Sequence, residues 1–276
     1  MKLGISSLGH IIELGLTGKF KNLFDLLFKA SKECLNFAED FGLDIVELVI
    51  DPPDVFKSEA RQKFIDMINS YSLKKQIHGP FIDMNLSSHN NLISEASIEA
   101  YIESMKICND VGVKMLTIHP GVANFLLPSI RKFNKKQLKT AIFQLLDFAN
   151  KRGIIICLEN MPRNTHIMTD HKNIEDVFNI INRKDLFLTY DTSHFYTCDG
   201  DVKYLWTKLH SSIKNIHLVD NFSKFTDTHP ALGTGKINFK EIFDVIRTNN
   251  YQGPMIIELS DAKSLNQSIN YINKFL

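Results

Sequence analysis

Histidines and carboxylates recur at or just beyond the ends of short apolar runs in this chain. They are His78, His119, Glu159, Asp191 with His194, His217, Asp227 with His229, and Glu258. Imidazole and carboxylate ligands without a thiolate suit Zn²⁺, Mn²⁺ or Fe²⁺ and disfavour an all-oxygen Mg²⁺ or Ca²⁺ cage. The residue types therefore predict a divalent metal centre, with zinc or manganese favoured.

The apolar character of these runs strengthens the prediction. Glu159 ends the run Ile154–Glu159 and Glu258 follows Met255–Ile257, and buried carboxylates at such ends are costly unless cations pair with them. A multinuclear centre generates hydroxide at neutral pH and holds both oxygens of a phosphoester, whereas one or two metals could polarise a sugar carbonyl and hydroxyl. The number of metals thus bears on the reaction.

The elements that must position these residues alternate along the chain. Eight apolar runs predict strands at Lys2–Ser7, Ile45–Ile50, Lys75–His78, Met115–His119, Ile154–Glu159, Leu186–Asp191, Asn215–Asp220 and Met255–Leu259. Helical spacing between them predicts helices such as Asn22–Phe41, Ser94–Val111, Lys135–Arg152 and Phe239–Asn249. Glycines that end helices precede several strands, at Gly42, Gly112, Gly153 and Gly253. The repeat predicts an α/β fold, a closed (β/α)₈ TIM barrel, whose strand ends converge on one mouth.

Composition sets the wider bounds. With 276 residues and 44% hydrophobic content, the chain fits one domain over residues 1–276. A net charge of +1 provides no global field for nucleic acid. Four scattered cysteines without a Cys-x-x-Cys pair argue against a disulfide framework and fit a reducing, cytoplasmic setting. The amino terminus reads as a strand and then a loop, with neither a signal peptide nor a membrane span, and no obligate protein partner is evident.

Short motifs around the candidate ligands carry a family resemblance. They read His78-Gly79-Pro80, His119-Pro120-Gly121, Glu159-Asn160, Asp191-Thr192-Ser193-His194, His217-Leu218-Val219-Asp220-Asn221, Asp227-Thr228-His229 and, on the last strand, Glu258. Over nearly the whole chain this pattern resembles the xylose isomerase-like TIM barrel superfamily (AP endonuclease family 2). Within it, the chain is similar to endonuclease IV and to related sugar phosphate isomerases and epimerases.

The resemblance to endonuclease IV implies up to three metal ions, with zinc favoured. His78, His119 and a bridging Glu159 would hold the first. The second would be held by Glu159, Asp191, His217 and Glu258, and the third by His194, Asp227 and His229. The family's reaction implies in-line attack of hydroxide on phosphorus, with Glu258 orienting or deprotonating the water.

Other segments depart from the endonuclease IV pattern. Asp51-Pro52-Pro53-Asp54 replaces a basic and aromatic DNA-entry loop, and Leu3–Ser7 lacks the usual first-strand histidine. Met161-Pro162-Arg163 replaces a small, glycine-containing turn. Phe81-Ile82 retains an aromatic and aliphatic pair where the nuclease inserts side chains, although a packed loop would look the same.

Substrate contacts are predicted from three further residues. Arg163 and Lys236 could hold a phosphate or carboxylate, and Glu47, in the second strand, could touch substrate at the mouth or make a loop hydrogen bond. The basic cluster at residues 131–139 is more simply a solvated helical face than a phosphate site.

The complete ligand set favours phosphoester hydrolysis of the endonuclease IV type, with abasic-site DNA held locally. The alternative is a sugar or sugar-phosphate isomerase or epimerase. There, one metal on the second ligand group would polarise a small sugar substrate, while Glu159, Glu258 or His194 moves a proton. A metal-stabilised binding barrel is a third interpretation, disfavoured because structural sites are closed by four buried ligands.

Overall fold

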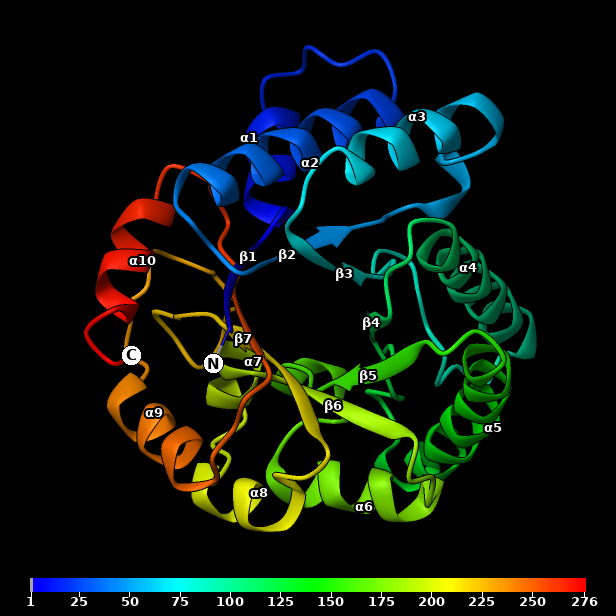
Figure 1. Cartoon of the computed structure of the whole chain (residues 1–276). Helices are drawn as coiled ribbons and strands as arrows, with labels where there is room; N and C mark the ends of the chain where they lie inside the picture. Colours follow the sequence, from blue (N-terminus) through cyan, green and yellow to red (C-terminus); the bar gives the residue numbers. More distant parts are fainter. Residues whose placement is uncertain (1) are drawn as a thin grey trace.

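Eight parallel strands form one closed barrel in the computed structural model, which describes residues 2–276 (Figure 1). The strands are β1 Lys2–Ser6, β2 Ile45–Val49, β3 Lys74–His78, β4 Met115–Ile118, β5 Ile155–Glu159, β6 Leu186–Asp191, β7 Ile213–Leu218 and β8 Pro254–Ile257. Each strand pairs with its neighbours in chain order, and β8 closes the ring on β1. The predicted (β/α)₈ barrel is confirmed.

Helices surround the strands as an outer layer in Figure 1. They are α1 Leu8–Gly15, α2 Leu23–Asp40, α3 Ser58–Asn69, α4 Asn91–Asp110, α5 Arg131–Asn150, α6 His171–Ile181, α7 Thr192–Thr197, α8 Val202–Leu209, α9 Phe239–Thr248 and α10 Leu265–Ile272. Short 3₁₀ turns lie at Pro53–Val55, Pro128–Ile130 and Arg163–Thr165. Among the described residues, no helix combines the length and apolar character that crossing a membrane requires.

Two sequence-based expectations about this layer need correction. The segment after β1 is the helix α1, and the loop predicted there is wrong; Leu8, Ile11 and Ile12 recur at helical spacing and line the barrel mouth. Gly42, Gly112 and Gly153 adopt positive φ after their helices, as expected. After α9, however, Asn250 takes that conformation at φ 48° in place of Gly253.

The barrel interior contains a polar layer beneath the mouth. Glu47, Gln76, Thr117, Thr189 and Asn215 point inward from their strands and are buried. Their side chains hydrogen-bond to one another, as when Gln76 Nε2 donates to Glu47 Oε2 at 2.6 Å. Such a layer replaces the branched aliphatic residues usual inside TIM barrels and supports the residues above it.

Candidate metal centre

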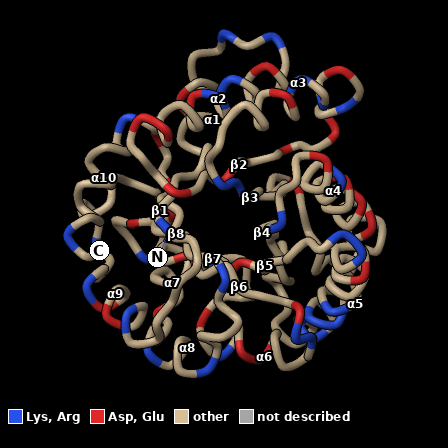
Figure 2. The backbone as a smooth tube through the Cα atoms, viewed as in Figure 1, with Lys and Arg blue, Asp and Glu red and all other residues tan. Residues whose placement is uncertain are grey.

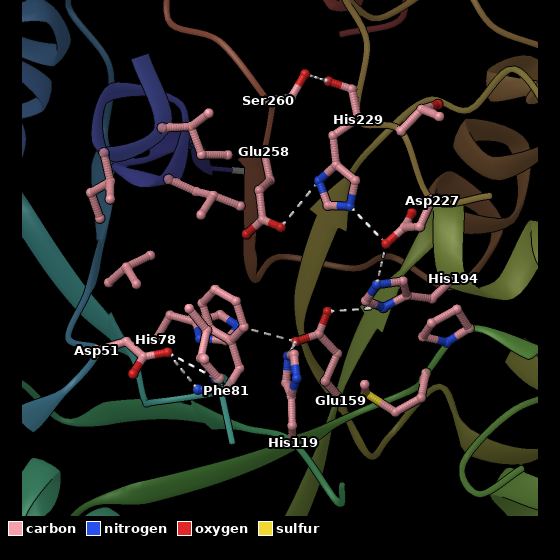
Figure 3. Close-up of a pocket in the computed structure, with 18 of the residues that line it drawn as sticks. Asp51, His78, Phe81, His119, Glu159, His194, Asp227, His229, Glu258 and Ser260 are labelled. Carbon is pink, nitrogen blue, oxygen red and sulfur yellow. Dashed lines mark hydrogen bonds and ion pairs between the residues drawn. The ribbon is translucent and has the colours of Figure 1, made fainter. Parts of the chain in front are cut away.

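A cavity of about 580 Å³ opens at the carboxyl ends of the strands (Figure 3). Its apolar wall includes Leu8, Ile11 and Ile12 of α1. Its polar side is formed by predicted ligands, of which the following line the cavity directly: His78, His119, Glu159, His194, Asp227, His229 and Glu258. The strand ends converge here as the barrel topology requires.

The first predicted ligand group meets at one carboxylate oxygen. Glu159 Oε2 lies 3.3 Å from His78 Nε2 and 2.9 Å from His119 Nε2. His78 and Glu159 are the last residues of β3 and β5, and His119 directly follows β4. Three neighbouring strands therefore bring these donors together.

The second group is arranged around His217 in β7. Its Nδ1 lies 3.1 Å from Glu159 Oε1, 3.9 Å from Asp191 Oδ2 and 3.8 Å from Glu258 Oε2. Asp191 ends β6, and its other oxygen accepts a hydrogen bond from the backbone N–H of His194 at 2.7 Å, capping α7. The cap fixes the carboxylate while leaving Oδ2 directed at the group.

The third group combines α7 with the loop between β7 and α9. Asp227 Oδ2 lies 3.0 Å from His194 Nε2 and 3.0 Å from His229 Nε2. His229 adopts φ 45°, and Ser260 donates both its backbone N–H and its hydroxyl to the His229 carbonyl. Figure 3 shows these side chains directed toward one another.

Polar contacts on the far side of three imidazole rings, two hydrogen bonds and one ion pair, hold the rings in orientation. His78 Nδ1 lies 2.8 Å from the Gly79 carbonyl, and His194 Nδ1 lies 2.9 Å from the Asn160 carbonyl. His217 Nε2 lies 2.9 Å from Glu47 Oε1. Proteins hold metal-binding histidines in this way, with the outer nitrogen donating to a fixed acceptor.

Two buried atoms show that the donor set fits metal ions. Asp191 Oδ2 and His229 Nδ1 have no hydrogen-bond partner among the described residues, although buried polar atoms rarely lack one. Burial raises the pKa of Asp191 to about 7, and the nearby Glu159 and Asp227 charges act in the same direction. Bound cations would supply the missing partners and the missing positive charge.

Protons occupy the same positions in the metal-free protein. Burial alone would lower the pKa of His78, but Glu159 outweighs it and raises that pKa to about 9. The pKa values of His194 and His217 are also raised, because the neighbouring carboxylates outweigh burial.

Metal loading is therefore expected to release protons and to weaken as the pH falls from about 9 towards 6.5. Protonated His78 stabilises the metal-free fold; this contribution is complete below pH 6.5 and disappears as pH rises through about 9. Titration calorimetry in buffers of different ionisation enthalpy measures the release. Metal affinity that does not change over this range would contradict the expectation.

The acidic loop after β2 organises the cavity wall. Asp51 Oδ2 accepts hydrogen bonds from the backbone N–H groups of Phe81 and Ile82, at 3.0 and 2.9 Å. Phe81 packs against the rings of His78 and His119, with centroids 5.5 and 5.6 Å apart, while Ile82 is exposed. Phe81 is therefore packed into the wall, as a packed loop predicts, whereas the exposed Ile82 is free to contact a ligand.

The three predicted substrate residues lie outside the cavity. Glu47 is fully buried beneath His217, so the expectation that it touches substrate is wrong. Arg163 lines an outer groove, because its guanidinium donates to the Thr197 carbonyl and pairs with Asp199. Lys236 is exposed and lines a separate hollow near α8 and α9.

Comparisons with known proteins agree with this architecture. The sequence pattern of a family described as "Xylose isomerase-like TIM barrel" matches residues 35–275. A protein named probable endonuclease 4, from Metamycoplasma arthritidis, is 27% identical over 277 residues, covering 92% of this chain and 95% of that one.

Solved structures share the fold at lower identity. A D-tagatose 3-epimerase-like protein superimposes with a TM-score of 0.81 at 21% identity, covering 100% of this chain and 97% of the other. The IOLI protein with a bound zinc atom superimposes with a TM-score of 0.76 at 19% identity, covering 100% and 96% of the two chains.

Proposed function

Because this chain belongs to the xylose isomerase-like TIM barrel family, we propose that it is a metal-dependent phosphoester hydrolase of the endonuclease IV type, acting at abasic sites in DNA. One observation carries the proposal. The third ligand group, His194, Asp227 and His229, stands beside the two groups that share Glu159, with Asp227 Oδ2 3.0 Å from each imidazole. A single-metal sugar isomerase has no use for that additional group.

Charge balance also supports a three-metal centre. The predicted ligands include four carboxylates, Glu159, Asp191, Asp227 and Glu258. The positive charge of three divalent ions would exceed these four negative charges, and the resulting net positive charge would attract a phosphodiester. One ion would leave the site negative, so that it repels the same substrate.

The chain's own groups would position the reactants. Zinc or manganese ions would lower the pKa of water and stabilise charge on phosphorus and on the leaving oxygen. Glu258, a member of the second group, also faces the third, with Oε1 3.4 Å from His229 Nδ1 and Oε2 3.8 Å from His217 Nδ1. From there it can orient a water molecule and accept its proton. The apolar wall from α1 and Phe81 would exclude other water.

A basic path leads away from the cavity. Pro162 and Asp227 line both the cavity and the outer groove that contains Arg163, Lys224 and Phe225. His166 lines that groove and a further one, bordered by five cations: Arg131, Lys132, Lys135, Lys136 and Lys139. Figure 2 shows the Lys and Arg residues of this region at α5. The path fits a DNA strand whose phosphates continue beyond the cleaved bond. We therefore interpret the basic cluster at residues 131–139 as a phosphate-binding surface and not only as a solvated helical face.

Removing two exposed cations from this path tests its role. The double substitution Lys132→Gln and Lys136→Gln is expected to weaken binding of abasic duplex and to lower the slope of log affinity against log salt by about 0.9 for each phosphate that the protein no longer neutralises. Fluorescence anisotropy at several salt concentrations measures the slope. Lys21→Gln with Lys32→Gln, near and on α2, is the control; an equal effect there would mean that only net charge matters.

Epimerisation or isomerisation of a sugar or sugar phosphate is the second candidate. The cavity of about 580 Å³ is large enough for a small sugar, and Glu159 and Glu258 both lie near His217 Nδ1. These carboxylates could move a proton between adjacent carbons beside one metal. The D-tagatose 3-epimerase-like fold relative makes such substrates worth testing.

Incision of an abasic-site duplex by zinc- or manganese-loaded protein tests the first candidate, together with metal analysis. We expect cleavage and about three ions per chain, as the three ligand groups predict. One ion per chain, no cleavage and turnover of ketoses or their phosphates would establish the second candidate instead. We further propose a cytoplasmic setting, because the free cysteines fit a reducing compartment. We also propose that the chain acts without an obligate protein partner.

A further inference from the structure

We propose that Glu47 is a positioning residue that holds His217 in the tautomer required for metal binding. The inference rests on the metal centre proposed above, but not on the reaction, because both candidate reactions use the His217 group. It also replaces the substrate contact that the sequence predicted for Glu47.

The two nitrogens of His217 face different partners. Nε2 lies within ion-pair distance, 2.9 Å, of Glu47 Oε1, a buried atom that has no hydrogen-bond partner among the described residues. Nδ1, on the other side of the ring, faces Glu159 at 3.1 Å and two further carboxylates. A proton held on Nε2 leaves the Nδ1 lone pair free for a metal ion.

Glu47 itself is fixed from below. Its Oε2 accepts hydrogen bonds from Gln76 Nε2 at 2.6 Å and from Asn215 Nδ2 at 3.2 Å. Glu47, Asn215 and His217 are each 0% exposed, so their arrangement cannot relax into solvent. The carboxylate therefore has one oxygen anchored in the polar layer and one directed at the imidazole.

A hydrogen bond from Asn215 would favour the opposite tautomer of His217. Its Nδ2 lies 3.0 Å from the same Nε2 and could donate to it, which would place the imidazole proton on Nδ1 and block metal binding there. We infer that the tautomer favoured by Glu47 is the one present. A hydrogen bond from His217 Nε2 to a charged carboxylate is stronger than a hydrogen bond from the neutral Asn215 amide to Nε2. Glu47 is the charged acceptor here, since the amide hydrogen bonds that its Oε2 receives from Gln76 and Asn215 favour the ionised carboxylate.

The outer nitrogens of the other two anchored histidines face different acceptors. The outer nitrogens of His78 and His194 face backbone carbonyls, which no substitution can remove. His194 Nδ1 also lies 3.4 Å from Glu159 Oε1 and 3.7 Å from Asp191 Oδ1, but both of these carboxylates belong to the candidate ligand set. Among the three imidazoles, His217 is the one whose outer nitrogen faces a carboxylate outside that set, and a carboxylate raises the basicity of the coordinating nitrogen more than a carbonyl does. Loss of Glu47 should therefore weaken one metal ion selectively.

Metal binding measured by competition with a chromogenic chelator tests the role. We expect Glu47→Gln to lower zinc affinity of one ion by about 10- to 100-fold and to leave the remaining ions unchanged. The double substitution Glu47→Gln with Gln76→Glu is the matched control, since it keeps buried charge and volume but moves the carboxylate away from His217. Unchanged affinity in E47Q, or full recovery in the double variant, would overturn the proposal.

A measurement on the unmodified protein covers the case in which E47Q does not fold. Long-range ¹H–¹⁵N correlation spectra of the zinc-loaded protein report which imidazole nitrogen carries the proton. We expect a protonated Nε2 and a metal-shifted Nδ1 for His217, assigned by comparison with His217→Gln. A bare Nε2 would overturn the proposal. If the unmodified protein binds no metal, this inference and the proposed function both fall; equal affinities for E47Q and the unmodified protein overturn this inference alone.

Discussion

Replacing Glu258 with Gln is expected to lower the rate of abasic-site cleavage by about 10³-fold, within the range that general acid-base groups contribute. The carboxylate lies between His217 and His229, at 3.8 and 3.4 Å. An amide of the same shape cannot accept a proton from water, and it is a weaker metal ligand. Single-turnover cleavage of a labelled duplex at saturating metal measures the chemical step.

Two measurements make the Glu258 result specific. Glu99→Gln, on the exposed face of α4, changes the same functional group far from the cavity and should leave the rate unchanged. Metal content determined alongside the rate shows whether E258Q acts through loss of an ion or through loss of the proton acceptor. A rate within a few-fold of that of the unmodified protein would remove Glu258 from the mechanism.

Replacing Asp227 with Asn is expected to remove one ion per chain and to slow hydrolysis by about 10²- to 10³-fold, the loss typical when one stabiliser of transition-state charge is removed. Asp227 Oδ2 lies 3.0 Å from both His194 and His229, so it is the centre of the third group. The His217 group contains none of these three residues and should keep its metal. Metal analysis and cleavage rates on the same preparation measure both effects.

The Asp227 substitution also separates the two candidate functions. A sugar epimerase working at the His217 group would keep most of its activity in D227N, because its metal ligands and its two Glu residues remain. Asp244→Asn, on α9 and paired with Lys240 and Arg247, is the surface control. Unchanged metal content in D227N would contradict a third site.

Most candidate ligand positions could be predicted because, in a (β/α)₈ barrel, a residue at the carboxyl end of any strand lies at the same mouth. His78, Glu159 and Asp191 each end a strand, and parallel strands direct those ends to one mouth. Asp227 and His229 lie in the loop after β7, so the strand-end argument predicted only that they are near the mouth; their grouping with His194 came from the family pattern, because loop conformation follows no such periodicity. The helix α1 could have been predicted from the spacing of Leu8, Ile11 and Ile12, which a loop does not require.

Side-chain direction is what the tertiary structure decided. Arg163 follows the Glu159 segment closely, yet it points into the outer groove because Thr197 and Asp199, more than thirty residues later, bind its guanidinium. Glu47 lies in β2, near the mouth in sequence. Its depth in the barrel depends on how the strands are staggered, which places Gln76, Asn215 and His217 around it.

The chain's sequence by itself determined the barrel, the identities of its candidate metal ligands and their placement at one mouth. The hydrophobic period of each segment and the order of strands and helices along the chain can be read directly from the sequence. Only the tertiary structure decided which ligands share an oxygen, that Asp191 Oδ2 and His229 Nδ1 lack partners among the described residues, and that Glu47 supports His217 from beneath. These features depend on contacts between residues far apart in the chain, and no local pattern encodes the distances among them.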